Sequence, residues 1–210
     1  MISVEKALEI ILNNVTGLPE ERVPVFEAAG RFLSEDIVAG ENIPPVDNSA
    51  MDGYAVIAAD TRDATADNPR ELRITEEVRA GGSAQGIRAE AGLAVRIMTG
   101  APVPAGADAV IQFEDTRERG NRLEIYRQVG EGENIRRAGE DVSRGSTVLH
   151  PGRRLGSAEM GLLASLNYGE VRVYRRPRVA VISTGDEVAE VGEPLQEGHI
   201  RNSNAYTLYG

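Results

Sequence analysis

The sequence predicts an α+β protein in which a block of short strands lies between helical segments. Three observations predict this fold class. Apolar residues recur at helical spacing over residues 3–15 and 157–166, short apolar or alternating stretches recur between residues 43 and 142, and residues 178–183 form a strand with an apolar centre. Such a centre is typical of parallel strands buried on both faces. The last part of the sequence therefore predicts the start of an α/β domain.

The N-terminal helix is predicted from its cap and its periodicity. Ser3 is a suitable N-cap residue, and Glu5 lies in the first turn, where a negative charge is favourable. The apolar face is formed by Val4, Leu8, Ile11 and Val15. Gly17 and Pro19 end the helix. A second helix is predicted over residues 25–33.

Residues 43–142 are predicted to form a β-barrel-like domain. Proline sterics hold residues 43–46 extended. Strands are then expected at residues 54–57, 72–78, 93–98, 109–113 and 123–126. Asp-Gly, Gly-Gly, Gly-Asn and Pro-x-Pro turn signals separate these strands. Several short strands in one block are typical of a barrel or a sandwich.

The C-terminal part of the sequence predicts alternating helices and strands. A helix is expected at residues 157–166, a strand at 171–174 and the apolar strand at 178–183, and Ser203 or Asn204 is a candidate cap of a further helix. A parallel strand needs partner strands at its edges. We therefore expect the chain to be an N-terminal fragment whose last residues open a domain that continues outside this sequence.

The composition excludes several classes of function. The 210 residues include 33 acidic and 23 basic ones, for a net charge of −10, whereas a general nucleic-acid binder needs excess positive charge. No apolar run reaches the roughly 18 residues of a membrane-spanning helix. The N-terminus lacks the basic region and the cleavage site of a signal peptide. Cysteine is absent, and we expect a cytoplasmic protein without nucleic-acid or membrane partners.

Four polar clusters lie in loops beside predicted strands, where functional sites usually occur. They span residues 47–54, 98–104, 134–141 and 183–187. The first can be turn chemistry or a pair of carboxylates, and the second can be a strand end or an anion-binding nest. The third can be a surface ion-pair cluster, or arginines that clamp phosphate beside carboxylates that hold a hard cation. The fourth follows a parallel strand, at the edge where open α/β sheets bind ligands.

The residue types favour oxygen ligands for any metal. His150 and His199 are far apart in the sequence, and neither has a second imidazole at ligand spacing, so a zinc site is not expected. Carboxylate ligands favour Mg²⁺ instead. Spacing alone leaves the structural and the functional interpretation of each cluster open.

Together and in this order, the four clusters resemble MoeA, the molybdopterin molybdenumtransferase family, which includes the E domain of gephyrin. The matching segments are PPVDNSAMDGYAV at residues 44–56, RIMTGAPVP at 96–104, NIRRAGED at 134–141 and STGDEV at 183–188. The resemblance extends over essentially the whole chain, and the first motif is too long to match by chance.

The resemblance implies an α+β multidomain fold. Residues 20–42 and 143–176 would form a small α+β domain, with the β-barrel-like domain of residues 43–142 inserted in it. Residues 177–210 would start a truncated α/β, molybdopterin-binding, Rossmann-like domain, and the N-terminal helix within residues 1–19 would pack on that domain. The residues expected to meet in this packing are Val4, Leu8, Ile11, Val179 and Val181.

The resemblance also implies an activity, which is insertion of molybdenum from molybdate into adenylylated molybdopterin with Mg²⁺-dependent release of AMP. It implies a homodimer whose site lies between the subunits. The positions tied to activity are those of Asp52, Thr99, Asp141 and Glu187. Expected substrate contacts are Arg136, Arg137, Ser183, Thr184 and Gly185, and the expected Mg²⁺ ligands are Asp186 and Glu187.

MoeA proteins continue through the rest of the α/β domain and a C-terminal β-barrel, which this sequence lacks. We therefore expect the chain to be inactive alone, although a full-length parent would be an enzyme. Two alternatives are a non-catalytic interaction scaffold of the gephyrin E-domain type and a stand-alone β-barrel binding module. A stand-alone module leaves the C-terminal residues unexplained. A scaffold does not need the carboxylates of the motifs, and because this sequence keeps all of them, the enzyme is favoured. Proteins of the molybdenum cofactor pathway are further candidate partners.

Overall fold

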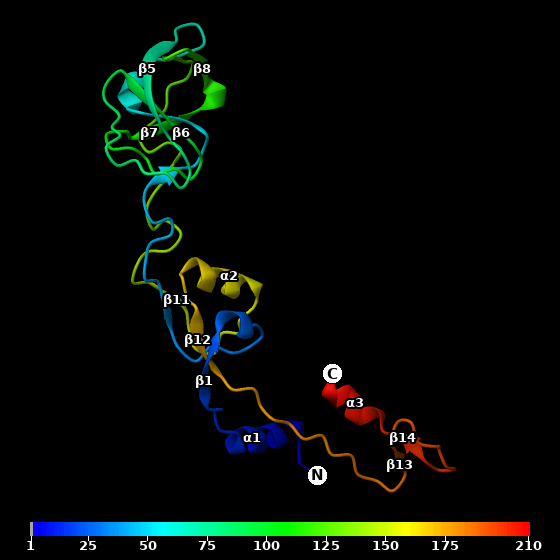
Figure 1. Cartoon of the computed structure of the whole chain (residues 1–210). Helices are drawn as coiled ribbons and strands as arrows, with labels where there is room; N and C mark the ends of the chain where they lie inside the picture. The colour runs from blue at the N-terminus through cyan, green and yellow to red at the C-terminus, as the bar shows by residue number, and fades with distance from the viewer. Residues whose placement is uncertain (1) are drawn as a thin grey trace.

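The chain is elongated and has an α+β fold, as predicted (Figure 1). The computed structural model describes residues 2–210. A curled sheet occupies one end, and a ribbon of two chain segments joins it to a small middle unit of β1, β2, β11, α2 and β12. Two arms leave the middle unit. One carries α1, and the other is an extended segment that leads to a C-terminal unit of β13, β14 and α3.

The elements are short, as the density of turn signals predicts. The α-helices are α1 (Val4–Asn14), α2 (Ser157–Ser165) and α3 (Ser203–Tyr209), and the 3₁₀ helices are η1 (Val25–Glu27), η2 (Ala58–Thr61) and η3 (Phe113–Asp115). The strands up to the middle of the chain are β1 (Glu20–Pro24), β2 (Ile37–Val38), β3 (Asn48–Ser49), β4 (Gly53–Val56), β5 (Arg70–Val78), β6 (Leu93–Ile97) and β7 (Ala109–Gln112). The remaining strands are β8 (Thr116–Arg119), β9 (Arg122–Ile125), β10 (Ile135–Arg136), β11 (Thr147–Leu149), β12 (Glu170–Tyr174), β13 (Val188–Ala189) and β14 (Ile200–Arg201).

The large sheet has six strands in the order β7-β4-β6-β5-β9-β8. All neighbours are antiparallel except β5 and β6, which run parallel, so the sheet is mixed. It curls into a half-barrel (Figure 1), and its edge strands β7 and β8 are not paired with each other within residues 2–210. The five strands predicted here are confirmed as β4, β5, β6, β7 and β9.

Both faces of the half-barrel are buried at its centre. Side chains alternate between the two faces of a strand, and all four residues of β4 are buried. Tyr54 and Val56 join one apolar cluster with Ile111, whereas Ala55 joins a second cluster with Val110. Loops therefore cover the face that an ordinary one-sided antiparallel sheet would leave in water.

The middle unit draws its core from two segments that flank the half-barrel in sequence. Strand β1 pairs with β12, and β2 pairs with β11, both antiparallel. The buried cluster combines residues between 23 and 39 with residues between 149 and 173. Chain segments more than one hundred residues apart thus share one core, while the domain boundaries expected from the resemblance stay predictions.

The predicted N-terminal helix is confirmed, but the second predicted helix is wrong. The Ser3 side chain caps α1 by accepting a hydrogen bond from the backbone N–H of Lys6 at 3.2 Å. Within residues 25–33, in contrast, three residues form a 3₁₀ turn. Gly30 has a φ of +75°, which breaks a helix, and its N–H donates to the carbonyl of Leu155 at 2.7 Å. This backbone takes long-range partners in place of helical ones.

The predicted strand at residues 178–183 is also wrong for this chain. These residues are irregular and exposed, since no strand within residues 2–210 pairs with them. The helix predicted at Ser203 or Asn204 is confirmed as α3, and its cap lies one residue earlier, where the Asn202 side chain accepts from the N–H of Ala205.

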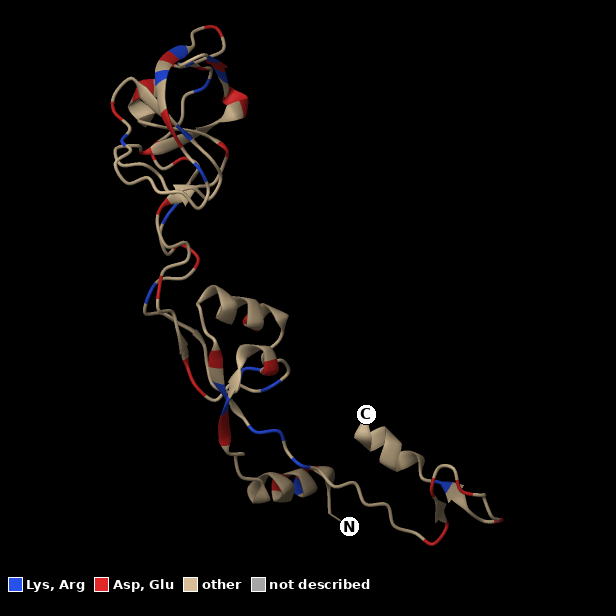
Figure 2. Cartoon of the chain, in the orientation of Figure 1, with Lys and Arg blue, Asp and Glu red and all other residues tan. Residues whose placement is uncertain are grey.

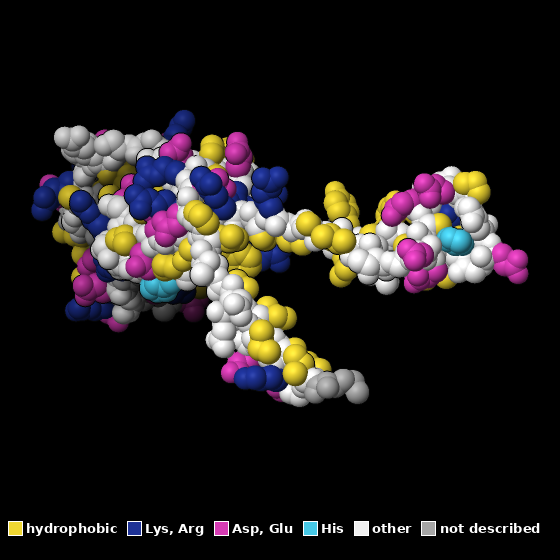
Figure 3. Space-filling model, turned by 90° about the horizontal axis from the view of Figure 1, so that it is seen from below, with side chains coloured by type: hydrophobic (Ala, Val, Ile, Leu, Met, Phe, Trp, Pro, Cys, Tyr) yellow, Lys and Arg dark blue, Asp and Glu magenta, His cyan; other side chains and the backbone are white. Residues whose placement is uncertain are grey.

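The predicted packing of the N-terminal helix on residues 177–210 is not found. Leu8 is 53% exposed and Ile11 57%, and Val179 is 78% exposed on the other arm. Figure 3 shows apolar side chains at the surface of both arms. Among residues 2–210 the longest helix is α1, with 11 residues, and no helix has both the length and the apolar character needed to cross a bilayer.

Candidate functional site

Three of the four polar clusters meet at the end of the half-barrel where the ribbon leaves it (Figure 1). The short strands β3 and β10 pair antiparallel and join the first cluster to the third. The second cluster flanks the same strand: the N–H of Ser49 donates to the carbonyl of Ala101 at 3.0 Å, and the N–H of Gly100 donates to the carbonyl of Ser49 at 2.8 Å. Backbone hydrogen bonds therefore hold loops from three parts of the sequence together.

Asp52 and Thr99 form the most direct contact between the first and the second cluster. One carboxylate oxygen of Asp52, Oδ1, accepts from both the backbone N–H and the hydroxyl of Thr99, each at 2.7 Å. The backbone N–H first, and then the hydroxyl, hold the pKa of Asp52 below its usual range. Oδ2 makes no hydrogen bond within residues 2–210. Asp52 is thus an oriented, ionised carboxylate with one oxygen available to a ligand.

Gly53 allows this arrangement because β4 passes very close to β7. A Cβ atom at Gly53 would lie 2.0 Å from the carbonyl oxygen of Ile111 and 2.9 Å from the Cα of Gln112. No side chain fits in that gap. The glycine that follows Asp52 therefore allows β7 to lie very close to β4, the strand that Asp52 directly precedes.

In the third cluster, Arg136 is bound by two carboxylates. Its Nε donates to Oε1 of Glu140 at 2.6 Å, and one of its terminal nitrogens donates to Oδ2 of Asp141 at 2.5 Å. Glu140 first, and then Asp141, raise the pKa of Arg136. The arginine predicted to contact an anion is thus already paired within the chain.

Arg137 is paired as well, and it links the third cluster to the first. Its guanidinium donates to Oδ2 of Asp47 at 2.7 Å, and the N–H of Ala138 donates to Oδ1 of Asp47 at 2.8 Å. The Ala138 N–H, followed by the Arg137 side chain, lowers the pKa of Asp47. Asp47 therefore stays ionised and holds the loop after β10.

The charges of these loops decide what they can bind. Four carboxylates, those of Asp47, Asp52, Glu140 and Asp141, stand against the guanidinium groups of Arg136 and Arg137. Acidic and basic segments alternate along this part of the chain in Figure 2. An oxyanion can therefore bind here by displacing a carboxylate from an arginine, or together with positive charge from another source.

The fourth cluster lies apart from the other three, in the C-terminal unit (Figure 1). Ser183 donates through Oγ to Oδ1 of Asn202 at 2.8 Å, and residues 183–187 are all exposed. Gly185 has a φ of +135°, and a Cβ atom there would lie 2.6 Å from a carboxylate oxygen of Glu187. Within one chain, Glu187 does not reach Asp52.

The described residues provide carboxylates that suit Mg²⁺ but no complete cage of protein ligands. Residues 2–210 contain no group of three His, Cys, Asp or Glu side chains placed to hold a metal ion. Asp186 and Glu187 are adjacent, exposed carboxylates. Mg²⁺ is commonly bound by one or two carboxylates together with water and substrate phosphates. This donor set fits that mode.

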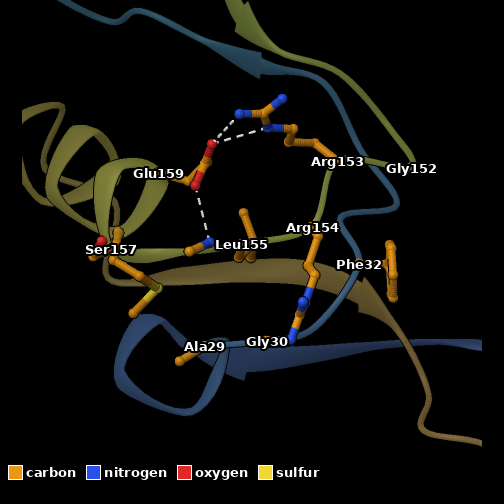
Figure 4. Close-up of a pocket in the computed structure, with 11 residues that line it drawn as sticks. Ala29, Gly30, Phe32, Gly152, Arg153, Arg154, Leu155, Ser157 and Glu159 are labelled. Carbon is orange, nitrogen blue, oxygen red and sulfur yellow. Dashed lines mark hydrogen bonds and ion pairs between the residues drawn. The ribbon is translucent and has the colours of Figure 1, made fainter.

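The structure has a pocket that the motifs do not indicate. It has a volume of about 830 Å³ and lies on the middle unit, between the turn at Gly30 and the start of α2. Figure 4 shows that Arg153 turns to Glu159, to which its Nε donates at 2.9 Å, while Arg154 runs toward Gly30. Phe32 stands beside Arg154. The sequence signal for this pocket is the pair of adjacent arginines, Arg153 and Arg154, but neither lies in one of the four motifs.

Comparisons with known proteins agree with the family resemblance. Residues 2–167 match the family model of the MoeA N-terminal region (domain I and II). Molybdopterin molybdenumtransferase 2 of Mycobacterium tuberculosis is 44% identical over 208 residues, which are 99% of this chain and 51% of that protein. Molybdopterin molybdenumtransferase of Staphylococcus epidermidis is 39% identical over 203 residues, or 97% of this chain and 48% of that protein.

A solved structure shares both the fold and part of the sequence. The crystal structure of the molybdopterin biosynthesis moeA protein from Pyrococcus horikoshii OT3 superposes with a TM-score of 0.91 at 38% identity and covers 100% of this chain and 56% of that one. The chain therefore spans about half the length of the relatives that it matches.

Proposed function

Since the chain belongs to the family of the MoeA N-terminal region, we propose that it serves molybdenum cofactor biosynthesis as part of a molybdopterin molybdenumtransferase. The observation that carries this proposal is the meeting of three motif loops at one end of the half-barrel, with Asp52 oriented by Thr99. The names of the relatives support the same activity.

The proposed reaction inserts molybdenum from molybdate into adenylylated molybdopterin and releases AMP. Cleavage of the phosphoric anhydride bond concentrates negative charge on phosphoryl oxygens, so catalysis depends on positioning and on charge stabilisation. In this chain, Asp52 and Asp141 would orient the substrate by accepting its hydrogen bonds. Arg136 and Arg137 would contact its anionic groups through the guanidinium N–H groups that their carboxylate partners do not use.

Ser183, Thr184 and Gly185 would contact the substrate from the fourth loop. Mg²⁺ would be held there by Asp186 and Glu187 together with phosphate oxygens, and when bound it would neutralise charge on the leaving phosphate. This positive charge would complement the loops of the half-barrel, whose carboxylates outnumber their arginines.

We propose that the site is completed between two subunits. The half-barrel of one subunit would face the fourth loop of its partner, because the half-barrel and the C-terminal unit of one chain lie far apart (Figure 1). An isologous dimer would then contain two such composite sites.

The test uses a hybrid that joins this chain to the part of the Mycobacterium tuberculosis relative that it does not match. We expect molybdate-dependent AMP release from the hybrid and none from the chain alone. Asp52→Asn and Glu187→Gln should each abolish release without loss of the folded state. A mixture of the two inactive hybrids should recover roughly a quarter of the activity, since half of the randomly formed dimers contain one intact composite site.

The outcomes separate the alternatives. If the two variants do not complement each other in verified mixed dimers, the site does not lie between subunits. If a folded hybrid releases no AMP, the enzyme assignment is wrong and the scaffold interpretation is favoured. A scaffold would also keep its partner binding when Asp52 and Glu187 are replaced. Thr116→Val, which removes a hydroxyl bonded to the Phe113 carbonyl outside the site, serves as the matched control and should keep full activity.

A further inference from the structure

The loop of residues 136–141 has an anchored backbone and exposed charged side chains. The N–H of Gly139 donates to the carbonyl of Pro44 at 2.9 Å, and the N–H of Asp141 donates to the carbonyl of Ile43 at 3.0 Å. Strand β10 ends at Arg136, and Gly139 has a φ of +75°. The side chains of Arg136 and Arg137 are 42% and 56% exposed, so long flexible groups on this loop sample many rotamers unless something fixes them. The partners of these side chains therefore determine where the charged groups of the loop lie.

Glu140 holds the loop from within. Its Oε1 accepts from Nε of Arg136 at 2.6 Å, and its Oε2 accepts from the backbone N–H of Arg137 at 2.8 Å. Arg136 in turn donates to Oδ2 of Asp141. The position of the Asp141 carboxylate thus depends on a guanidinium group that Glu140 orients.

Asp47 holds the same loop from the neighbouring cluster. Its two carboxylate oxygens accept from the Arg137 guanidinium and from the Ala138 N–H. Asp47 and Glu140 each have both oxygens engaged inside the loop, whereas Asp141 has one oxygen in use. A ligand can therefore reach Asp141 without breaking the loop, but it cannot bind Asp47 or Glu140 without releasing an arginine or a backbone N–H.

From this division we propose that Glu140 and Asp47 are positioning residues of the proposed site. They keep Arg136, Arg137 and Asp141 in one fixed arrangement beside the loops of Asp52 and Thr99. The catalytic meaning of this role rests on the proposed function, but the arrangement itself does not. Charge-assisted hydrogen bonds of this kind are strong and directional, which suits them to order an exposed loop.

The half-barrel contains a matched control for Glu140. Glu133 also accepts from one arginine, Arg127, at 2.7 Å and from one backbone N–H, that of Gly130, at 2.8 Å. The exposed fractions are 36% for the Glu140 side chain and 34% for Glu133. The two glutamates thus have the same chemistry and exposure, but Glu133 does not bond Arg136, Arg137 or Asp141.

The first experiment uses the chain itself and needs no activity. Glu140→Gln removes the negative charge and one of the two acceptor oxygens, so the Arg136 guanidinium loses its charge-assisted partner in either orientation of the amide. We expect exchange of the Arg136 Nε proton with water, measured by NMR, to accelerate about tenfold, because a hydrogen bond to a charged group is removed. The same amide substitution at Glu133 should leave this proton and the Asp141 carboxylate signal unchanged. Urea unfolding should show a similar, small loss of stability for both variants.

A purely structural role predicts a different pattern. If Glu140→Gln lowers stability but leaves the Arg136 Nε proton as protected as before, or if Glu133→Gln exposes it equally, the positioning role is wrong. Asp47→Asn should likewise accelerate the exchange of the Arg137 guanidinium protons with water. Glu140→Asp keeps two acceptor oxygens and should restore part of the protection.

The second experiment links position to catalysis in the hybrid described above. Glu140→Gln should lower kcat for AMP release about tenfold and change KM less than twofold, because the groups that it disorders act on the reacting charge. Glu133→Gln should change neither constant. A hybrid with no activity at all would contradict the proposed function, whereas the NMR measurement would still decide whether Glu140 and Asp47 position the loop.

Discussion

The half-barrel and the extended segment before the C-terminal unit contain similar sequence signals, yet their apolar runs end in opposite environments. The apolar run of β7 is fully buried, with Val110 and Ile111 at 0% exposure, whereas Ile182 in the apolar run at residues 178–183 is 80% exposed. β7 has a partner strand in β4, and the later run has no partner within residues 2–210. An apolar run thus becomes a strand where a neighbouring strand satisfies its backbone.

The motif loops also differ in whether they have partners within the chain. The first three are joined by backbone and side-chain hydrogen bonds within the chain, so half of the proposed site is already assembled. The fourth loop has its glutamate exposed and distant from the others. The half-barrel therefore holds its three loops in place, whereas the proposed site needs the fourth loop from a second subunit.

The largest expected effect comes from breaking the close approach of β4 and β7. Gly53→Ala places a Cβ atom 2.0 Å from a backbone oxygen of β7, and neither strand can move without disturbing both apolar clusters. We expect a loss of about 3 kcal/mol or more in the free energy of unfolding, at the upper end for overpacking. Urea unfolding followed by tyrosine fluorescence measures it.

Gly161→Ala is the control for that change. Gly161 lies inside α2, and a Cβ atom there meets nothing within 4 Å. Because glycine in a helix interior is destabilising relative to alanine, this substitution should raise the free energy of unfolding by roughly 0.5–1 kcal/mol. If both alanine substitutions have the same small effect, the packing of β4 against β7 does not hold the half-barrel together.

These contrasts show how much of the fold could be predicted from the sequence. The helix α1 and the strands of the half-barrel follow from local signals, such as the Ser3 cap and the alternation around Tyr54. The helix predicted at residues 25–33 failed because Gly30 bonds Leu155, a partner that lies 125 residues away. The strand at residues 178–183 failed because a strand depends on neighbours that local periodicity does not reveal.

The candidate site was predictable to a smaller extent. Residue types in the four loops indicated oxygen ligands and anion contacts, but spacing did not show that Asp52 would meet Thr99 or that Asp47 would meet Arg137. The family resemblance supplied the grouping. The ion-pair interpretation of residues 134–141 included the local pairing of Arg136 with Glu140 and Asp141. The pairing of Arg137 with Asp47 was not indicated, since an ion pair between distant loops depends on the folded backbone.

An intermediate effect on the free energy of unfolding is expected when one isoleucine in β7 and one in residues 178–183 are each shortened to valine. Ile111→Val removes a buried methylene and should lower the free energy of unfolding by about 1 kcal/mol. Ile182→Val should leave it unchanged, because that side chain is already in water in this chain. Urea denaturation of both variants side by side tests the contrast. A loss at Ile182 equal to that at Ile111 would mean that residues 178–183 are buried in solution.

The smallest effect concerns the hydrogen bond that orients Asp52. Thr99→Val removes the hydroxyl donor and keeps the backbone N–H, so the pKa of Asp52 should rise part of the way toward its usual value. Because the folded chain lowers this pKa, the stabilisation is present above about pH 4 and is lost as the pH falls through the folded-state pKa. The difference in unfolding midpoint between wild type and Thr99→Val should therefore stay constant from pH 7 to about pH 5 and disappear toward pH 3.

Carboxyl ¹³C NMR titration of Asp52 measures the change in its pKa directly, with Thr116→Val as the hydroxyl control that should not change it. An Asp52 titration that is the same in Thr99→Val and wild type would mean that the preassembled half of the site does not depend on this contact.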